Sequence, residues 1–412
     1  MFLFTVILAI LPVTASIPML HSFSIVRQAS WLGSITSDLF ANIRNQTKLQ
    51  SLLDNDHHWN RLSGVFLTGA SGGIGEALCW RLSRVNVSTT ITARPEKLSN
   101  LHAFATKINN ATESNLFTAE PLDLYRLCRY WDQHQYYTQS QHHGLINAVI
   151  HGAGLMAPRA SEEEIMHVNS YSPLALTILL LPRLISSVQQ QELNPVVVFV
   201  SSSSHLRGKP FDSSSTDIRQ DINSLTAYAN AKLHMMLAGT ALQKRLESTG
   251  ILIRFVHPGI VDTPMLQSYF GRFAFWGRSK LLRSPAEGAA AVILPVLSAI
   301  NEQRLDTARA DCAKDSKDST NAHDYRRLYY VDGVSSPQRC SPYLNDAEAC
   351  ENSFRDSIRV LPPSMRAYMS SQLRISAHSI PISPSKDASN LITERNQRCR
   401  SALLSLAQEV EQ

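Results

Sequence analysis

Residues 65–78 read VFLTGASGGIGEAL, and this stretch decides the fold. A short apolar run, typical of a buried strand, stops at a glycine-rich turn, and a segment with helical spacing follows at once. Gly69, Gly73 and Gly75 let the backbone turn tightly and approach an anion such as a pyrophosphate. The helix that follows directs free N–H groups and the positive end of its dipole at that anion. The stretch therefore predicts a nucleotide-binding strand, turn and helix, with Ser71 and Ile74 also in the binding turn.

Downstream of this turn, short apolar runs alternate with longer helix-like segments. Strands are predicted over residues 64–68, 88–93, 115–119, 146–152, 195–201 and 251–256, and helices over 74–84, 95–108, 124–139, 161–190 and 226–249. Strands that alternate with helices pair in parallel through right-handed crossovers. The prediction is an α/β fold with a doubly wound parallel sheet, the Rossmann fold, covered by helices on both faces.

The N-terminus carries the clearest targeting signal. No charged side chain precedes Arg27, and the apolar stretch is long enough to span or anchor in a bilayer. Basic residues follow it, which favours an uncleaved anchor in the endoplasmic reticulum membrane with the rest of the chain in the cytosol. A small-residue cluster at 13–16 suits signal-peptide cleavage, so a secreted or lumenal protein is the alternative. Sequons at Asn45, Asn86 and Asn110 fit that alternative.

Changes in composition divide the chain into five segments. Residues 1–26 are the anchor or signal, and residues 27–62 form an amphipathic linker. Residues 63–300 form the Rossmann domain, residues 301–326 a charged insertion, and residues 327–412 an extension that completes the domain. Within the extension, residues 361–390 mix proline and serine, which predicts largely irregular structure.

Charge and cysteine content exclude several classes of protein. The net charge of +5 over 412 residues comes from mixed basic and acidic residues without a basic stripe, so nucleic-acid binding is not indicated. The six cysteines form no Cys-x-x-Cys pair, and most are expected to be free thiols. A Cys340–Cys350 disulfide is the alternative in an oxidising lumen. The histidine doublets at 57–58 and 142–143 lack metal-ligand spacing, so no metal site is predicted.

The stretch TAYANAKLHMM places Tyr228 and Lys232 four residues apart, on one face of a predicted helix. Hydride transfer at a carbinol or carbonyl carbon needs a proton moved at the oxygen. A free tyrosine, with a pKa of about 10, is a poor base near neutral pH. A neighbouring ammonium stabilises the phenolate, which predicts a lowered pKa for Tyr228. The pair alone is weak evidence, because this spacing is common on exposed helices, but it gains weight downstream of the glycine-rich turn.

These motifs, in this order, resemble the short-chain dehydrogenase/reductase family, and most closely its membrane-anchored retinol dehydrogenase-like members. The spacing G-x-x-x-G-x-G after Thr68 is that of the family, and its motifs extend over residues 63–265. The family usually shows Asn-Asn-Ala-Gly after the fourth strand. Here His151 and Gly152 replace the two asparagines, while Ala153 and Gly154 remain, and His151 is interpreted as structural.

The resemblance implies the roles of individual residues. The catalytic set is Ser202, which holds the substrate oxygen, Tyr228, which transfers the proton, Lys232, and Asn169, which organises a relay water. Ser202 is chosen from the run VSSSSH, with Ser203 as the alternative if the strand register slips by one. Further cofactor contacts are implied for Arg94, Asp123, Gly152, Ala153, Gly154, Tyr228, Lys232, Pro258, Gly259, Val261 and Thr263. Arg94 ends the second strand where a carboxylate would select NAD, so NADP(H) is the expected cofactor.

The resemblance also implies an activity. The expected function is an NADP(H)-dependent oxidoreductase that interconverts a lipophilic alcohol and its aldehyde or ketone, of retinoid, sterol or polyprenoid type. The aromatic and basic stretch 264–284 suits an apolar substrate, a membrane contact, or packing onto the core. A homodimer through the helices 161–190 and 226–249 is a family expectation. The alternative is a nucleotide-binding scaffold or redox sensor of the same fold without appreciable turnover.

Overall fold

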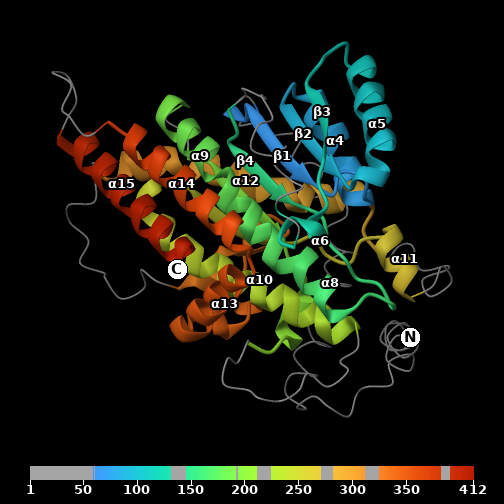
Figure 1. Cartoon of the computed structure of the whole chain (residues 1–412). Helices are drawn as coiled ribbons and strands as arrows, with labels where there is room; N and C mark the ends of the chain where they lie inside the picture. Colours follow the sequence, from blue (N-terminus) through green and yellow to red (C-terminus); the bar gives the residue numbers. More distant parts are fainter. Residues whose placement is uncertain are drawn as a thin grey trace.

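The computed structural model describes residues 59, 61–129, 131, 145–191, 194–210, 224–270, 282–310, 324–381 and 390–412. The predicted anchor at 1–26 and most of the linker at 27–62 lie outside these residues. The chain folds around an eight-stranded sheet with the order β3-β2-β1-β4-β5-β6-β7-β8 (Figure 1). The strands are β1 (Gly64–Thr68), β2 (Ser88–Ala93), β3 (Phe117–Pro121), β4 (Ala148–His151), β5 (Val196–Val200), β6 (Leu252–His257), β7 (Tyr329–Val331) and β8 (Val334–Ser335).

The sheet is parallel except at its last pair, where β8 runs antiparallel to β7. The doubly wound α/β fold predicted from the alternating pattern is therefore confirmed. Along the chain the strand order runs outward through β2 and β3, then returns to the other side of β1 with β4. Sheets with such a reversal bind their ligands at the carboxyl ends of the strands on either side of it, which here are β1 and β4.

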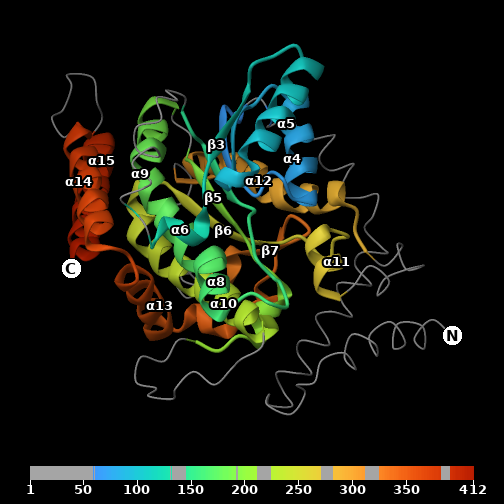
Figure 2. The same ribbon diagram turned by 45° about the vertical axis from the view of Figure 1, so that its right-hand side comes forward.

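Two helical layers cover the sheet, one on each face (Figures 1 and 2). One layer holds α4 (Gly73–Arg84), α5 (Leu98–Ala111) and α12 (Pro285–Ala310), which share a core with Val65 and Leu67 of β1. The other holds α9 (Ser172–Gln191) and α10 (Ser224–Leu246), which pack with Phe66 of β1. Successive residues of one strand thus enter opposite cores, as the period of two requires. Helices bury both faces of the sheet, which explains why the sequences of these strands are continuous apolar runs.

Within the described residues, one helical stretch, Glu162–Gln190, is long and apolar enough to cross a membrane. It comprises α8 (Glu162–Met166), a wide turn at His167–Tyr171, and α9. Of its most apolar window, 72% is buried inside the protein. Its apolar side chains, such as Leu174, Leu181 and Leu184, belong to the core between the sheet and α10.

The prediction of irregular structure over 361–390 is wrong, because α14 (Pro363–Ser379) occupies most of that segment. Pro363 stands at the first helical position, where its missing N–H costs nothing. Met365, Met369, Leu373 and Ala377 recur every four residues and are buried. The proline therefore begins this helix instead of breaking it. The helix packs along α15 (Asn390–Glu411), as Figure 2 shows.

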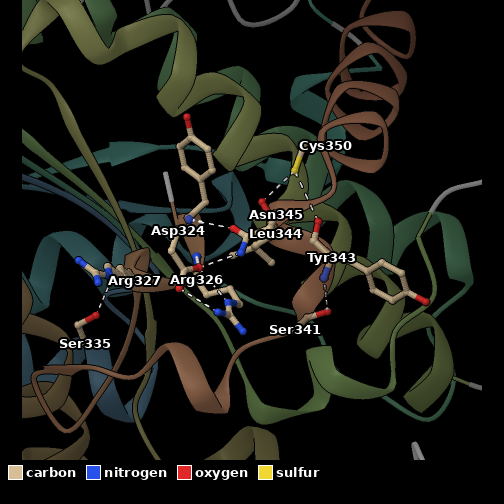
Figure 3. Close-up of polar contacts among 10 residues, drawn as sticks. Asp324, Arg326, Arg327, Ser335, Ser341, Tyr343, Leu344, Asn345 and Cys350 are labelled. Carbon is tan, nitrogen blue, oxygen red and sulfur yellow. Dashed lines mark hydrogen bonds and ion pairs between the residues drawn. The ribbon is translucent and has the colours of Figure 1, made fainter. Parts of the chain in front are cut away.

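Polar contacts at short helical turns join the residues just before β7 to the segment that leads from β7 to α13 (Ala347–Arg359) (Figure 3). Asp324 accepts hydrogen bonds from Arg326 Nε at 2.8 Å, Arg326 Nη2 at 2.9 Å and Asn345 Nδ2 at 2.9 Å. These contacts hold the pKa of Asp324 well below its usual range, chiefly through Arg326. Cys350 packs its thiol against the carbonyls of Tyr343 and Leu344, and both Cys340 and Cys350 are free thiols. The alternative of a Cys340–Cys350 disulfide is therefore not realised.

Charged contacts fasten the C-terminal helices to α10. Arg245 of α10 donates to both oxygens of Glu351 on α13, at 3.0 and 2.7 Å, and its Nε donates to Glu409 of α15 at 2.8 Å. In the buried layer beneath, Asp356 of α13 accepts from Tyr171 Oη at 2.8 Å and lies 3.2 Å from His234 Nε2. The extension is thus bound to the same helix that carries Tyr228 and Lys232.

We expect Arg245→Met to lower the free energy of unfolding by about 2 kcal/mol, because two carboxylates would lose charge-assisted hydrogen bonds and face each other. The pKa of Glu351 is lowered by Arg245, so this stabilisation is present near neutral pH and lost as the carboxyl protonates in acid. Urea unfolding of both proteins at pH 7 measures the loss. The matched control is Arg398→Met, whose guanidinium and its partner Glu394 are 69% and 61% exposed and should contribute little. Equal losses in the two variants would contradict the expectation.

Candidate active site

The glycine-rich turn joins β1 to α4 in a conformation that only small residues allow. Gly69 has φ of +80°, and a Cβ built on it would lie 2.5 Å from the amide nitrogen of Ala153. A Cβ on Gly75 would overlap the carbonyl of Gly69. Gly72 is the N-cap of the twelve-residue helix α4, and no side chain accepts a hydrogen bond from the first N–H groups at this cap. Such N–H groups at a helix N-terminus fit a pyrophosphate.

The predicted ribose and adenine contacts lie at the ends of β2 and β3. Arg94 directly follows β2, is 54% exposed, and pairs through Nε with Glu96 Oε1 at 3.2 Å. Asp123 caps α6 (Leu124–Leu127) by accepting from the backbone N–H groups of Tyr125 at 2.9 Å and Arg126 at 3.3 Å. The Arg94 guanidinium is therefore exposed enough to bind a phosphate, which would compete with Glu96 for it. The Asp123 carboxylate is already used to cap α6.

The HGAG segment after β4 approaches the glycine-rich turn closely. Ala153 N donates to Thr68 Oγ1 at 3.2 Å, and a Cβ on Gly152 would lie 2.9 Å from the carbonyl of Thr68. His151 points into the core, where its Nε2 meets Thr177 Oγ1 at 2.8 Å and its ring stacks on Phe199. Burial, and secondarily the charge of Lys232, lower the pKa of His151 to about 3. The imidazole is therefore neutral and lies in the core.

Asn169 lies in the wide helical turn His167–Tyr171, between α8 and α9. Its Nδ2 donates to the carbonyls of Ile165 and Leu155, both at 2.8 Å, and its Oδ1 accepts from Leu155 N at 3.1 Å. A π-type turn of this kind leaves backbone carbonyls without their usual helical partners, and the amide satisfies one of them. A Cβ on Gly154 would lie 3.1 Å from Asn169 Oδ1 and 3.9 Å from Lys232 Nζ. These two polar side chains therefore both reach Gly154.

Tyr228 and Lys232 lie one turn apart on α10 and are both buried. Lys232 Nζ donates to the carbonyl of Val200, at the end of β5, at 2.7 Å, and lies 5.6 Å from the centre of the Tyr228 ring. The side chain of Ser202, the second residue beyond β5, lies near enough to Tyr228 to lower the pKa of the phenol. The end of β5 and one face of α10 thus bring a hydroxyl, a phenol and an ammonium together.

The lowered pKa expected for Tyr228 is not what the structure has. Burial raises the pKa of Tyr228 to about 12, and the hydrogen bond with Ser202 offsets only part of this. Burial also lowers the pKa of Lys232 to about 8. Desolvation is therefore the larger effect on the pKa of this phenol. Near neutral pH the pair consists of a protonated phenol and a protonated amine, which suits proton donation to a carbonyl oxygen.

The four serines of the run at 201–204 have different surroundings. Ser201 is buried and donates to Met236 Sδ at 2.9 Å. Ser202 caps the short helix Ser203–Arg207 by accepting from Ser204 N at 3.2 Å, and its Oγ donates to Ser204 Oγ at 3.2 Å. Its side chain also lies near enough to Tyr228 to lower the pKa of the phenol. Ser203 is buried within that helix. Of the two predicted candidates, Ser202 is the one that meets the phenol.

The side chain of Arg283 packs against the Pro258-Gly259 turn after β6 and hydrogen-bonds to it. Arg283 Nη1 donates to the carbonyl of Pro258 at 3.0 Å, and Gly259 has φ of +83° with no room for a Cβ beside that guanidinium. Arg283 also pairs with Asp332 at 2.5 Å, in the turn between β7 and β8. Sequence reasoning missed Arg283, because its partners lie 25 and 49 residues away and share no motif with it.

The remaining predicted cofactor residues follow this turn. Val261 forms a backbone bridge with Arg283. Thr263 precedes α11 (Pro264–Phe270), and its Oγ1 accepts from Leu266 N at 3.4 Å. The methyl group of Thr263 lies 3.3 Å from where a Cβ of Gly73 would stand. The loop after β6 and the glycine-rich turn after β1 therefore face each other. Of the aromatic stretch 264–284, residues 271–281 lie outside the described part of the chain.

Comparison with known proteins finds similarity to short chain dehydrogenases. A family model described as short chain dehydrogenase matches residues 63–272. Dehydrogenase/reductase SDR family member 13 of Bos taurus is 30% identical over 54% of this chain and 59% of its own length. Retinol dehydrogenase 12 of Bos taurus is 31% identical over 55% of this chain and 70% of its own length. The solved short-chain dehydrogenase from Sphingobium yanoikuyae in complex with NADPH is 19% identical, over 63% of this chain and 99% of that chain, with a TM-score of 0.42.

Proposed function

Because the chain belongs to the short chain dehydrogenase family, we propose that it is an NADP(H)-dependent oxidoreductase that interconverts a lipophilic alcohol and its aldehyde or ketone. One observation carries the proposal. Ser202, Tyr228 and Lys232 meet at the end of β5, and Lys232 also reaches Gly154, beside the glycine-rich turn. An oxidoreductase of this type needs a proton donor and a nucleotide cradle within reach of each other.

The cofactor would be held by Gly69, Ser71, Gly73, Ile74 and Gly75 at the pyrophosphate, and by Arg94 and Asp123 near the adenosine. Gly152, Ala153, Gly154, Pro258, Gly259, Val261 and Thr263 would line the rest of its path. The missing Cβ atoms support this fit, because a side chain on Gly69, Gly75 or Gly154 would enter the space or strike the backbone. When bound, the cofactor supplies or accepts a hydride.

Side chains of this protein would bind, polarise and protonate the substrate oxygen. The hydroxyl of Ser202 would hold and polarise it, and Tyr228, protonated near neutral pH, would donate its proton to it. The Lys232 ammonium would stabilise the phenolate that remains. Asn169, whose amide is committed to Leu155 and Ile165, would hold the backbone that lines a relay water. With a mainly reduced cytosolic NADP pool, reduction of the carbonyl is the proposed direction.

The substrate class rests on the relatives and on the sequence. The name of retinol dehydrogenase 12 supports a retinoid, and a sterol or polyprenoid would offer the same apolar chemistry. Residues 1–26 would anchor the chain in the endoplasmic reticulum membrane, beside a substrate that partitions into lipid, with the Rossmann domain of residues 63–300 in the cytosol. The homodimer expected through α9 and α10 is not part of this proposal, because α13, α14 and α15 of the same chain pack against those two helices. Glycosylation at Asn45 or Asn110 would contradict the cytosolic placement.

The direct test is turnover of the purified full-length chain with NADPH and a panel of retinal, a polyprenal and a ketosteroid. The proposal expects oxidation of NADPH with at least one of these carbonyls. NADPH binding, followed by fluorescence, without turnover on any of them would favour the scaffold or redox sensor instead.

Cofactor choice gives a second prediction, on Arg94. We expect Arg94→Gln to weaken NADPH binding about tenfold and to leave NADH binding unchanged, since one charge-assisted hydrogen bond to the 2′-phosphate would be lost. Glu96→Gln is the matched variant. It removes the carboxylate that holds Arg94 at 3.2 Å and should tighten NADPH binding. Fluorescence titration with each nucleotide measures both effects, and equal weakening for NADH and NADPH in Arg94→Gln would contradict the assignment.

A further inference from the structure

His205 ends the serine run, and the catalytic roles described above make no use of it. It lies in the short helix Ser203–Arg207 and is fully buried. Its Nδ1 lies 2.6 Å from the backbone carbonyl of Ser202, the residue whose side chain lies near enough to Tyr228 to lower its pKa. Its Nε2 accepts a hydrogen bond from the backbone N–H of Ser341 at 3.2 Å. One imidazole therefore joins the peptide of Ser202 to the C-terminal extension, across 136 residues of sequence.

These two partners determine the chemical form of the ring. A backbone carbonyl can only accept a hydrogen bond, so Nδ1 must carry a hydrogen and donate it. A backbone N–H can only donate, so Nε2 must keep its lone pair. His205 is thus the neutral Nδ1–H tautomer, and neither the other tautomer nor the imidazolium satisfies both contacts.

The surroundings hold this ring rigidly. It packs against Tyr329 of β7, with ring centres 4.9 Å apart. Ser341 is itself ordered by a short helix, Pro342–Asn345, which it caps by accepting from Tyr343 N, as Figure 3 shows. The carbonyl of Ser202 receives a second hydrogen bond from the backbone N–H of His205 at 3.1 Å. The peptide plane after Ser202 therefore has little freedom to rotate.

Rotation of that plane would move the Ser202 side chain relative to the phenol. We propose that His205 is a positioning residue: as the Nδ1–H tautomer maintained by Ser341, it holds the Ser202 carbonyl and so aims the Ser202 hydroxyl at the substrate oxygen. This inference rests on the proposed function, because it assigns His205 a role through Ser202. It also gives the C-terminal extension a part in catalysis, since Ser341 belongs to it.

Two substitutions separate the two contacts. In His205→Asn the amide N–H can take the place of Nδ1–H and keep the bond to Ser202, but the contact to Ser341 is lost. In His205→Gln the longer side chain can place its amide oxygen near the former Nε2 and accept from Ser341, but the Nδ1 donor is gone. His378→Gln, at an exposed histidine near the end of α14, is the matched control.

The inference expects His205→Gln to lower kcat about tenfold, with the KM for NADPH unchanged, and His205→Asn to retain kcat within about threefold. Steady-state kinetics on full-length protein in detergent, with thermal unfolding of each variant, give these values. A purely structural role would lower stability in both variants and leave kcat per folded molecule alike. Equal kcat in the two variants would therefore overturn the inference.

A second measurement needs no turnover. In the ¹⁵N-edited imidazole spectrum of the wild-type chain, the His205 signal is assigned as the one missing in His205→Asn. It should show His205 Nδ1 protonated and His205 Nε2 unprotonated. An Nε2–H tautomer or an imidazolium at pH 7 would overturn the inference. Lack of turnover by the wild-type chain on every carbonyl would instead overturn the proposed function, and the spectrum would still decide the contact to Ser202.

Discussion

Tyr228→Phe should lower turnover with NADPH and carbonyl substrate by 10² to 10⁴, the range that a positioned proton donor contributes. Tyr228 is buried at the point where β5 ends, near the side chain of Ser202. Its pKa is raised to about 12, so the phenol holds its proton throughout the neutral range and can deliver it to the substrate oxygen. Phenylalanine keeps the ring and its packing but removes that proton.

Because only the hydroxyl is lost, NADPH affinity and the unfolding midpoint of Tyr228→Phe should stay close to those of the wild type. Initial rates, NADPH titration by fluorescence and urea unfolding give the three values. Tyr368→Phe is the matched control, on α14, where the ring packs against Trp131. Turnover by Tyr228→Phe at the wild-type rate would show that another group delivers the proton.

The parts of the molecule that were predictable are those whose signal is local. The strand, turn and helix at 64–84 follow from apolar residues and glycines that are neighbours in the sequence, and β1 begins and ends where it was predicted. The pairing of Tyr228 with Lys232 is equally local, because four residues separate them on one helix. The catalytic serine was predicted as Ser202, with Ser203 as the alternative, since identical residues do not show where the strand register lies.

The features that sequence reasoning missed depend on contacts between distant segments. The bond from Ser341 to His205 and the clamp of Arg283 on Pro258 join residues that share no motif. The sign of the pKa shift at Tyr228 was wrong for the same reason. Spacing reveals the neighbouring lysine, whereas burial comes from the packing of α13, the short helix Ser203–Arg207, α8 and other segments around α10. The helix α14 was missed because its first proline was interpreted as a breaker.

Replacing the buried ammonium of Lys232 should lower activity and raise stability, whereas Tyr228→Phe should lower activity alone. Burial lowers the pKa of Lys232 from its usual 10.5 to about 8. Between these values the folded chain binds fewer protons than the unfolded chain, so stability rises with pH across this window. At pH 7 the ammonium is charged, and its burial costs ~3 kcal/mol by this shift. A variant without the amine would also lose the hydrogen bond to the Val200 carbonyl, which costs about 2 kcal/mol.

We therefore expect Lys232→Met to raise the free energy of unfolding at pH 7 by about 1 kcal/mol while lowering turnover at least 100-fold. Methionine fills a similar volume without a charge to desolvate, but it cannot stabilise the phenolate of Tyr228. Urea unfolding at pH 7, 8.5 and 10 should show the wild type gaining stability relative to Lys232→Met as the pH rises. Lys244→Met, on the same helix but with its ammonium over the Tyr325 ring, is the matched control and should keep its turnover. Destabilisation of Lys232→Met at pH 7, with wild-type pH dependence, would mean that this amine is not buried as a charge.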